Sequence, residues 1–237
     1  MKKLLKISGF ALLFSALSLL LVFCSVDRYS KHAYAEATRD KPFDVIIVPG
    51  VPFEHFKTTK VMIMRLMWAK YLYDNGYTRN IIFSGSSVYS PYVEGITMKL
   101  IADTMGIPKD HTFAETKAEH STENAYYGWK MAQKMGFKKI ALATDPFQSS
   151  TLEGFLRHYC PGMKSIPIVF DKVDISTREL PKIALETAFV SDFVSIKKRE
   201  GFIKRWRGTL GRRVIEESAR EKQQKEVQEK LDARGSE

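Results

Sequence analysis

The sequence has few cysteines and lacks the short motifs of common nucleotide and hydrolase sites. Its two cysteines, Cys24 in an apolar run and Cys160 in HYCPG, are too differently placed to predict a disulfide. No G-x-G-x-x-G or Walker A pattern occurs, which argues against a standard dinucleotide or NTP site, and no serine lies in G-x-S-x-G. The histidines lack ligand spacing. We therefore expect neither a cofactor nor a metal.

Acidic residues are nearly absent from two segments, which makes the charge uneven. Residues 1–26 carry three lysines and no acid, and residues 197–213 carry eight Lys or Arg and one acid. Together they account for the whole net charge of +10, so the rest of the chain is neutral. A neutral body argues against nucleic-acid binding. Positive ends on a neutral domain favour a membrane lipid surface as a partner.

The chain has one long hydrophobic run, residues 7–24. These 18 residues carry no charge and as a helix span roughly 27 Å, about the thickness of a bilayer core. We expect an uncleaved single-pass anchor at 1–24, followed by a polar tether at 25–41. A cleaved signal with the A-x-A site at 33–35 and a lipoprotein modified at Cys24 remain alternatives. Lysines before the run favour a cytoplasmic N-terminus and an extracytoplasmic domain.

Apolar runs and helical segments alternate through the body at 42–196. The pattern predicts strands at 44–50, 80–87, 111–115, 138–145 and 165–170, with helices between them at 60–76, 92–105, 121–136 and 149–160. A last packed helix is expected at 180–196. This order predicts an α/β fold with a doubly wound, Rossmann-like parallel sheet of about five strands, ordered 3-2-1-4-5.

Polar residues and glycines follow the predicted strands, at the edge where such sheets bind ligands. The ligand-binding candidates are Gly50, Arg65, Ser84, Gly85, Ser86, Glu94, Ser121, Asn124, Thr144 and Gln148. The candidates for general acid or base are Glu115, Glu123 and Asp145. The alternatives are structural: tight turns at the glycines, an acid in a first helical turn at Glu94, and helix caps at Ser121 and Asp145.

Arg65 stands out because it lies between VMIM and LMW in a helix that is apolar nearly all round. A buried arginine needs a partner, either a carboxylate or a ligand anion, unless its long stem carries the charge to the surface. The glycine-rich strand ends are candidates for an anion nest of backbone N–H groups. Asn124 is a weak helix former, so capping alone does not explain the stretch ETKAEHSTENA at 115–125.

Several short motifs recur in the order of a known family. They are R-x3-A-x2-L-Y-x2-G from Arg65 to Gly76, Ser84-Gly85, Glu94 with Met98, Gly106-Ile107-Pro108, and Glu115 followed by the S-T-E-N of residues 121–124. Over roughly residues 44–170 the chain resembles the YdcF/SanA/ElyC family of bacterial envelope-linked α/β proteins. Where that family commonly has T-S-x-x-H-x-x-R-A, this chain has Asp145, Gln148 and Thr151 in place of Ser, His and Arg.

The resemblance implies a role in the bacterial cell envelope. We expect a protein of the inner membrane that supports envelope integrity by binding or processing a small anionic precursor, phosphorylated or lipid-linked. The alternative is a non-catalytic ligand-binding or scaffolding module at the membrane, which the loss of the family's His and Arg favours.

The tail at 197–237 is predicted to be helical, first basic and amphipathic and then charged and exposed. Phe202, Trp206, Leu210 and Val214 recur every four residues among Lys and Arg. This segment is expected either to lie on an anionic membrane surface or to pack on the domain with its basic residues solvated.

Overall fold

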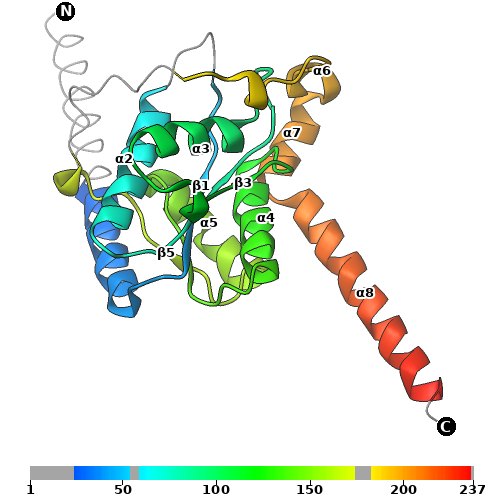
Figure 1. Ribbon diagram of the computed structural model, residues 1–237. Coiled ribbons are helices and arrows are strands. Elements are labelled where there is room, and N and C mark those ends of the chain that lie inside the picture. The colour runs from blue at the N-terminus through cyan, green and yellow to red at the C-terminus, as the bar shows by residue number, and fades with distance from the viewer. Residues whose placement is uncertain (1–23, 54–58, 174–182, 236–237) are drawn as a thin grey trace, which may run out of the picture.

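The computed structural model describes residues 24–53, 59–173 and 183–235 (Figure 1). Its centre is a five-stranded parallel sheet of β1 (Val45–Pro49), β2 (Ile81–Ser84), β3 (Thr112–Glu115), β4 (Ile140–Leu142) and β5 (Lys164–Ser165). The strand order is β3-β2-β1-β4-β5. The predicted α/β class and the 3-2-1-4-5 order are confirmed.

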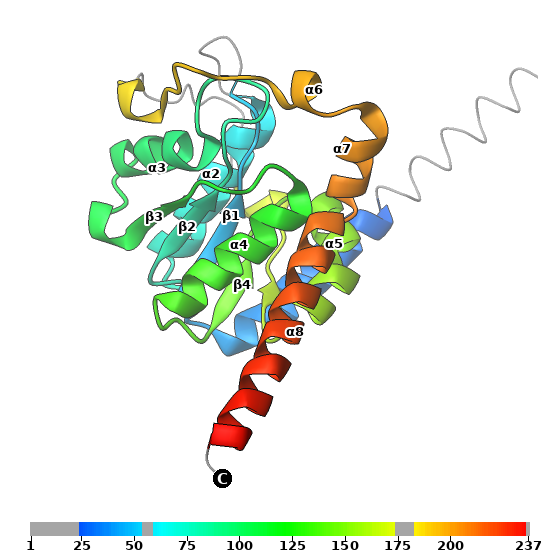
Figure 2. The same cartoon turned by 90° about the vertical axis from the view of Figure 1, so that its right-hand side faces the viewer.

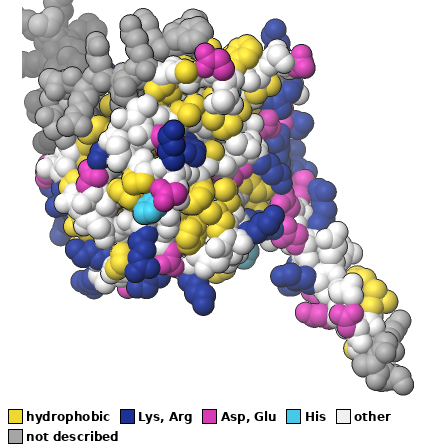
Figure 3. All heavy atoms as spheres, viewed as in Figure 1, with side chains coloured by type: hydrophobic (Ala, Val, Ile, Leu, Met, Phe, Trp, Pro, Cys, Tyr) yellow, Lys and Arg dark blue, Asp and Glu magenta, His cyan; other side chains and the backbone are white. Residues whose placement is uncertain are grey.

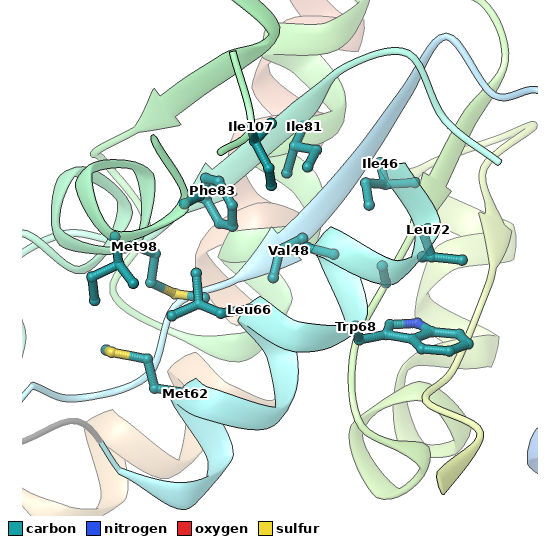
Figure 4. Close-up of a cluster of buried hydrophobic side chains, with 14 of the residues drawn as sticks. Ile46, Val48, Met62, Leu66, Trp68, Leu72, Ile81, Phe83, Met98 and Ile107 are labelled. Atoms are coloured by element: carbon teal, nitrogen blue, oxygen red, sulfur yellow. The ribbon is translucent and has the colours of Figure 1, made fainter. Parts of the chain in front are cut away.

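Helices cover both faces of this sheet. On one face lie α2 (Lys60–Asp74) and α3 (Glu94–Thr104), and on the other lie α4 (Ser121–Lys134) and α5 (Pro146–Tyr159). Successive side chains of a strand point to opposite faces. Ile46 and Val48 therefore join the core with α2 and α3 (Figure 4), while Val45 and Ile47 join the core with α4 and α5.

The strand register aligns the carboxyl ends of the first three strands at one edge of the sheet. Pro49 pairs with Ser84, and Ser84 pairs with Glu115, so β1, β2 and β3 end level with one another. The fourth and fifth strands are shorter than predicted, but the pairing continues beyond them, because Ile168 N donates to Thr144 O at 2.9 Å. Short 3-10 turns complete the domain: η1 (Thr38–Asp40), η2 (Lys109–His111), η3 (Phe170–Lys172) and η4 (Glu186–Ala188).

The predicted tether at 25–41 is wrong, because residues 24–37 are helical and packed on the domain. The Tyr34 ring lies 5.8 Å from that of Trp68, and its hydroxyl donates to the Tyr77 hydroxyl at 2.7 Å. Ala37 is buried. Aromatic and small residues three and four positions apart make this stretch amphipathic, although its composition is polar.

The packed helix expected at 180–196 is also wrong for the described part, which begins at residue 183. This part holds only η4 and the start of α6 (Ile196–Arg199). The rest of this part is an extended segment that runs beside the start of α3. There Val93 N donates to Ala188 O, and Ile196 N donates to Val88 O. Ala188 and Ile196 are buried in this way without a helix.

The tail forms α7 (Phe202–Thr209) and α8 (Arg212–Gly235). Both contact α4, and α8 continues beyond the body of the domain (Figure 2). Residues 1–23 of the expected anchor lie outside the described residues. Among the described residues, no helix combines the length and apolar character that a membrane crossing requires.

Candidate functional site

A small cavity opens at the carboxyl ends of the central strands. Its volume is about 120 Å³, and four of the predicted residues line it: Gly50, Glu94, Ser121 and Asn124. The remaining walls come from Pro52, Val88, Tyr89, Ala118, Glu119, His120 and, from the tail, Thr209. The other predicted residues do not line the cavity, and their positions are described below.

Glu94, the first residue of α3, is the buried acid of the cavity. Its carboxyl group lies against Gly50 and Gly85, where a Cβ would overlap Glu94 Oε2 at Gly50 and lie 3.0 Å from it at Gly85. The two glycines therefore leave room for this carboxyl group. Burial raises the pKa of Glu94 to about 8, although the nearby Arg65 opposes the rise. Glu94 is thus mainly protonated, and able to donate a hydrogen bond, at neutral pH.

The expected anion nest at the strand ends is not formed. The backbone N of Gly50 donates to Ser84 O at 2.5 Å, that of Gly85 to Glu115 O at 2.9 Å, and that of Ser86 to Ala118 O at 2.7 Å. These N–H groups are used within the fold. Gly50, Gly85 and Ser86 therefore hold the turns after the strands, and the two glycines also leave room for Glu94.

Arg65 is buried in α2 and paired, which excludes the surface alternative. Its Nη2 donates to Asp145 Oδ2 at 2.5 Å, and its Nη1 donates to the carbonyls of Pro49 and Gly50 at 3.0 Å each. Burial lowers the pKa of Arg65, with Asp145 opposing. Burial alone would raise the pKa of Asp145, but the Arg65 guanidinium outweighs it and holds that pKa below its usual value.

Asp145 has a second role as the N-cap of α5, since Oδ1 accepts from Gln148 N at 3.0 Å. The neighbouring Thr144 hydroxyl donates to Gln148 Oε1 at 2.5 Å. Asp145 is thus held by an ion pair and a cap, and neither it nor Gln148 lines the cavity. Together with Arg65, this group joins the ends of β1 and β4.

A second polar group connects β2 and β3 to the cavity. Ser84 Oγ donates to Glu115 Oε2 at 2.5 Å and lies 3.1 Å from Asn124 Oδ1. Glu115 Oε1 accepts from Lys117 N at 2.5 Å. Burial raises the pKa of Glu115 above its usual value, and these hydrogen bonds oppose the rise. Because Asn124 lines the cavity, Ser84 and Asn124 together link the Glu115 carboxyl group to that space.

Glu123 is separated from the other candidates and faces the tail. Its Oε2 accepts from Glu119 N at 2.8 Å, and its Oε1 lies 3.5 Å from Arg213 Nη1. Arg213 also pairs with Glu119 at 2.8 Å and with the buried Glu200. Burial raises the pKa of Glu123, and Arg213 opposes the rise. The sequence pattern of 121–124 did not reveal this partner, which lies 90 positions later in the sequence.

The N-terminus of α4 opens on the cavity. Ser121, predicted as the N-cap, is the first helical residue, and the cap position belongs to His120, which makes no side-chain cap hydrogen bond. The first backbone N of this turn with an intrahelical bond is that of Asn124, which donates to His120 O at 2.9 Å. The N–H groups of residues 121–123 lack intrahelical partners, as at any helix start. Because Ser121 lines the cavity, this helix start offers backbone donors beside it.

His120, which the sequence does not mark as a site residue, lines the cavity and packs beneath the tail. A Cβ at Gly208 would overlap its ring, and its Nε2 lies 3.7 Å from Glu200 Oε2. Burial lowers the pKa of His120. Within the described ranges, no group of three or more His, Cys, Asp or Glu is placed to hold a metal ion.

Comparisons of the chain with protein-family models, with curated proteins and with solved structures found no match. The resemblance to the YdcF/SanA/ElyC family therefore stays a prediction from sequence motifs.

Proposed function

We propose that this protein is a single-pass protein of the bacterial inner membrane, with a cytoplasmic N-terminus, whose extracytoplasmic α/β domain supports the cell envelope. The domain binds or processes a small anionic envelope precursor, phosphorylated or lipid-linked, at the carboxyl ends of its strands. The uncharged run at 7–24 and the sequence motifs support the location.

The observation that carries the ligand proposal is the set of hydrogen-bond donors around one cavity. The uncapped N-terminus of α4, the protonated Glu94 and the side chain of Asn124 all border it. A helix N-terminus favours anions through its free N–H groups and its dipole. A neutral Glu94 adds a donor without adding negative charge.

The size of the cavity limits what it can hold. Its volume of about 120 Å³ is below the roughly 300–1,000 Å³ of pockets that enclose a whole small molecule. The cavity therefore suits a compact anionic group, such as a phosphate, with the rest of the ligand outside. This is the form in which a phosphorylated or lipid-linked precursor would bind.

If the site is catalytic, the structure favours one expected acid, Glu115, and adds Glu94, which was expected only to bind ligand. Asp145 is neutralised by Arg65, and Glu123 pairs with the tail. Glu94 lines the cavity with a pKa of about 8, and Glu115 is connected to it through Ser84 and Asn124. Acids with raised pKa values are suited to general acid catalysis near neutral pH.

The binding experiment titrates the full chain in detergent micelles with inorganic phosphate and with short-chain phosphatidic acid, by calorimetry. Asn124→Asp places a negative charge at the cavity, so it should weaken binding by about tenfold or more. Asn75→Asp is the matched control, because Asn75 is exposed at the end of α2. Absence of binding by both probes, or equal binding by both variants, would contradict the proposal.

The non-catalytic alternative is favoured by the engagement of Asp145 and Gln148 in capping and pairing. Glu94→Gln separates the two roles, because glutamine keeps the donor but cannot transfer a proton. A variant that binds phosphate and restores envelope integrity in a deletion strain indicates a binding module. A variant that binds but does not restore integrity indicates acid–base chemistry.

A further inference from the structure

Helix α7 turns its apolar side to solvent. Phe202, Ile203, Trp206 and Leu210 are 75%, 64%, 58% and 57% exposed. An amphipathic helix on a folded domain normally buries that side. Large exposed apolar patches mark sites of interaction with proteins or membranes, so this face is a candidate docking surface.

The orientation of α7 follows from the helical period and from one close contact. At about 100° per residue, the four apolar residues fill one arc of the helix, and Gly208 lies opposite its centre. Gly208 is buried against His120, and its carbonyl accepts from Thr122 Oγ1 at 3.1 Å. Any side chain at 208 would meet the His120 ring. This contact holds the apolar arc outward.

The exposed charged residues within 197–213 are all basic, and Glu216 of α8, which pairs with Arg212, is the acid beside them. Lys197, Lys198, Lys204, Arg207 and Arg212 are exposed, whereas the one acid of residues 197–213, Glu200, is buried and paired with Arg213. Figure 3 shows Lys and Arg side chains along the edge of the molecule where α6 and α7 lie. A groove of about 700 Å³ between α7 and α8 continues the apolar surface, with Phe202 and Ile203 among its lining residues.

We propose that α7 docks the domain onto an anionic lipid surface. Phe202, Trp206 and Leu210 enter the boundary between headgroups and acyl chains, and the surrounding Lys and Arg contact lipid phosphates. Apolar residues on one face with basic residues around them are the pattern of helices that lie in a membrane interface. The complementary charge favours anionic lipid over a second copy of this chain, whose own α7 carries the same positive charge.

Docking through α7 would also hold the cavity at a fixed position relative to the lipid surface. Thr209, the last residue of α7, lines the cavity together with Ser121 and Asn124. A docked α7 therefore keeps the candidate site beside the lipid headgroups. The docking surface and the cavity use different residues, apart from this shared wall, so each can be tested without the other.

The test measures Trp206 fluorescence in the full chain reconstituted into vesicles that contain phosphatidylcholine brominated on its acyl chains. The chain has three tryptophans, so Trp206→Phe, measured in parallel, isolates the Trp206 signal. We expect about twofold or greater quenching of this signal when half of the lipid is phosphatidylglycerol, and little when all of it is phosphatidylcholine. High salt should reduce the quenching, because it screens the charge attraction.

Two matched pairs of variants locate the effect. Leu210→Ser should reduce the quenching, and Leu231→Ser should not, since Leu231 is equally exposed, at 56%, near the end of α8. Arg207→Gln should reduce it, and Arg157→Gln, at the far end of α5, should not.

Several results would overturn the proposal. Equal quenching in both lipid mixtures, no quenching in either, or equal effects within each pair of variants would each exclude specific docking through α7. A dimer in detergent that Leu210→Ser dissociates would assign the surface to a second copy. Each of these results would leave the proposed phosphate site untouched, because the docking variants do not change Asn124 or Glu94.

Discussion

The buried carboxyl group of Glu94 predicts an unusual pH dependence of stability. Its pKa is about 8 in the folded protein against 4.5 for the ordinary value, so the folded state holds a proton that the unfolded state releases between these values. Stability should be fully present below about pH 4.5 and be lost as the pH rises through about 8, by roughly 1.4 kcal/mol per pH unit. The loss over the whole window is on the order of 5 kcal/mol.

Glu94→Gln removes this titration while keeping the shape and a hydrogen-bond donor. The variant should match the wild type near pH 4.5 and exceed its free energy of unfolding at pH 9 by up to about 5 kcal/mol. Five kcal/mol is a large part of the stability of an ordinary domain, about 5–15 kcal/mol. The wild type should therefore become much easier to unfold in mildly alkaline solution.

Urea unfolding of the full chain in detergent, followed by circular dichroism at several pH values, measures the effect. Glu153→Gln is the control, because Glu153 is exposed on α5 and its removal should leave the pH slope unchanged. The explanation fails if Glu94→Gln and the wild type lose stability in parallel between pH 5 and 9, since the carboxyl group would then be solvated in the folded state.

Three further predictions concern the tail and the cavity. Arg213→Ala leaves buried Glu200 without its main cation and should lower the free energy of unfolding by about 3 kcal/mol in urea titrations. Gly208→Ala forces a Cβ into the His120 ring and should cost about 1–3 kcal/mol, measured by thermal melting against Gly154→Ala, which has open space. Phosphate affinity should fall as the pH rises through about 8, because Glu94 ionises, and calorimetry of Glu94→Gln should show no such fall.

The order of strands was accessible from the sequence because the central strands are buried on both faces. Residues 45–49 and 81–83 form continuous apolar runs, and the first is followed by Gly50 and the second by Ser84. The intervening segments are long enough for right-handed crossovers, which leave few possible topologies. The errors lie where burial comes from contacts remote in sequence: the helix at 24–37 packs on Trp68, and the segment from 183 runs beside α3.

The candidate site was predictable as a place but not as a set of contacts. Strand ends of a parallel sheet meet at one edge, so Gly50, Ser84 and Glu115 could be assigned to it from the sequence alone. The partner of Arg65 could not be assigned from the sequence, because several carboxylates follow the strands at the same edge of the sheet. The folded structure shows that the partner is Asp145. The prediction of a buried, partnered Arg65 was correct for the physical reason given, the high penalty of an unpaired buried charge.

The tail contributes to the site in two ways, because it pairs with one residue of α4 and supplies part of the cavity wall beside the next. Asn124 lines the cavity, while Glu123 pairs with Arg213 beyond the end of α7. The contacts that hold Arg213 and Gly208 against α4 also place Thr209 in the cavity wall and turn the apolar arc of α7 outward. Loosening this joint should therefore alter phosphate affinity and lipid docking together, whereas changes at Asn124 or Leu210 should alter only one of them.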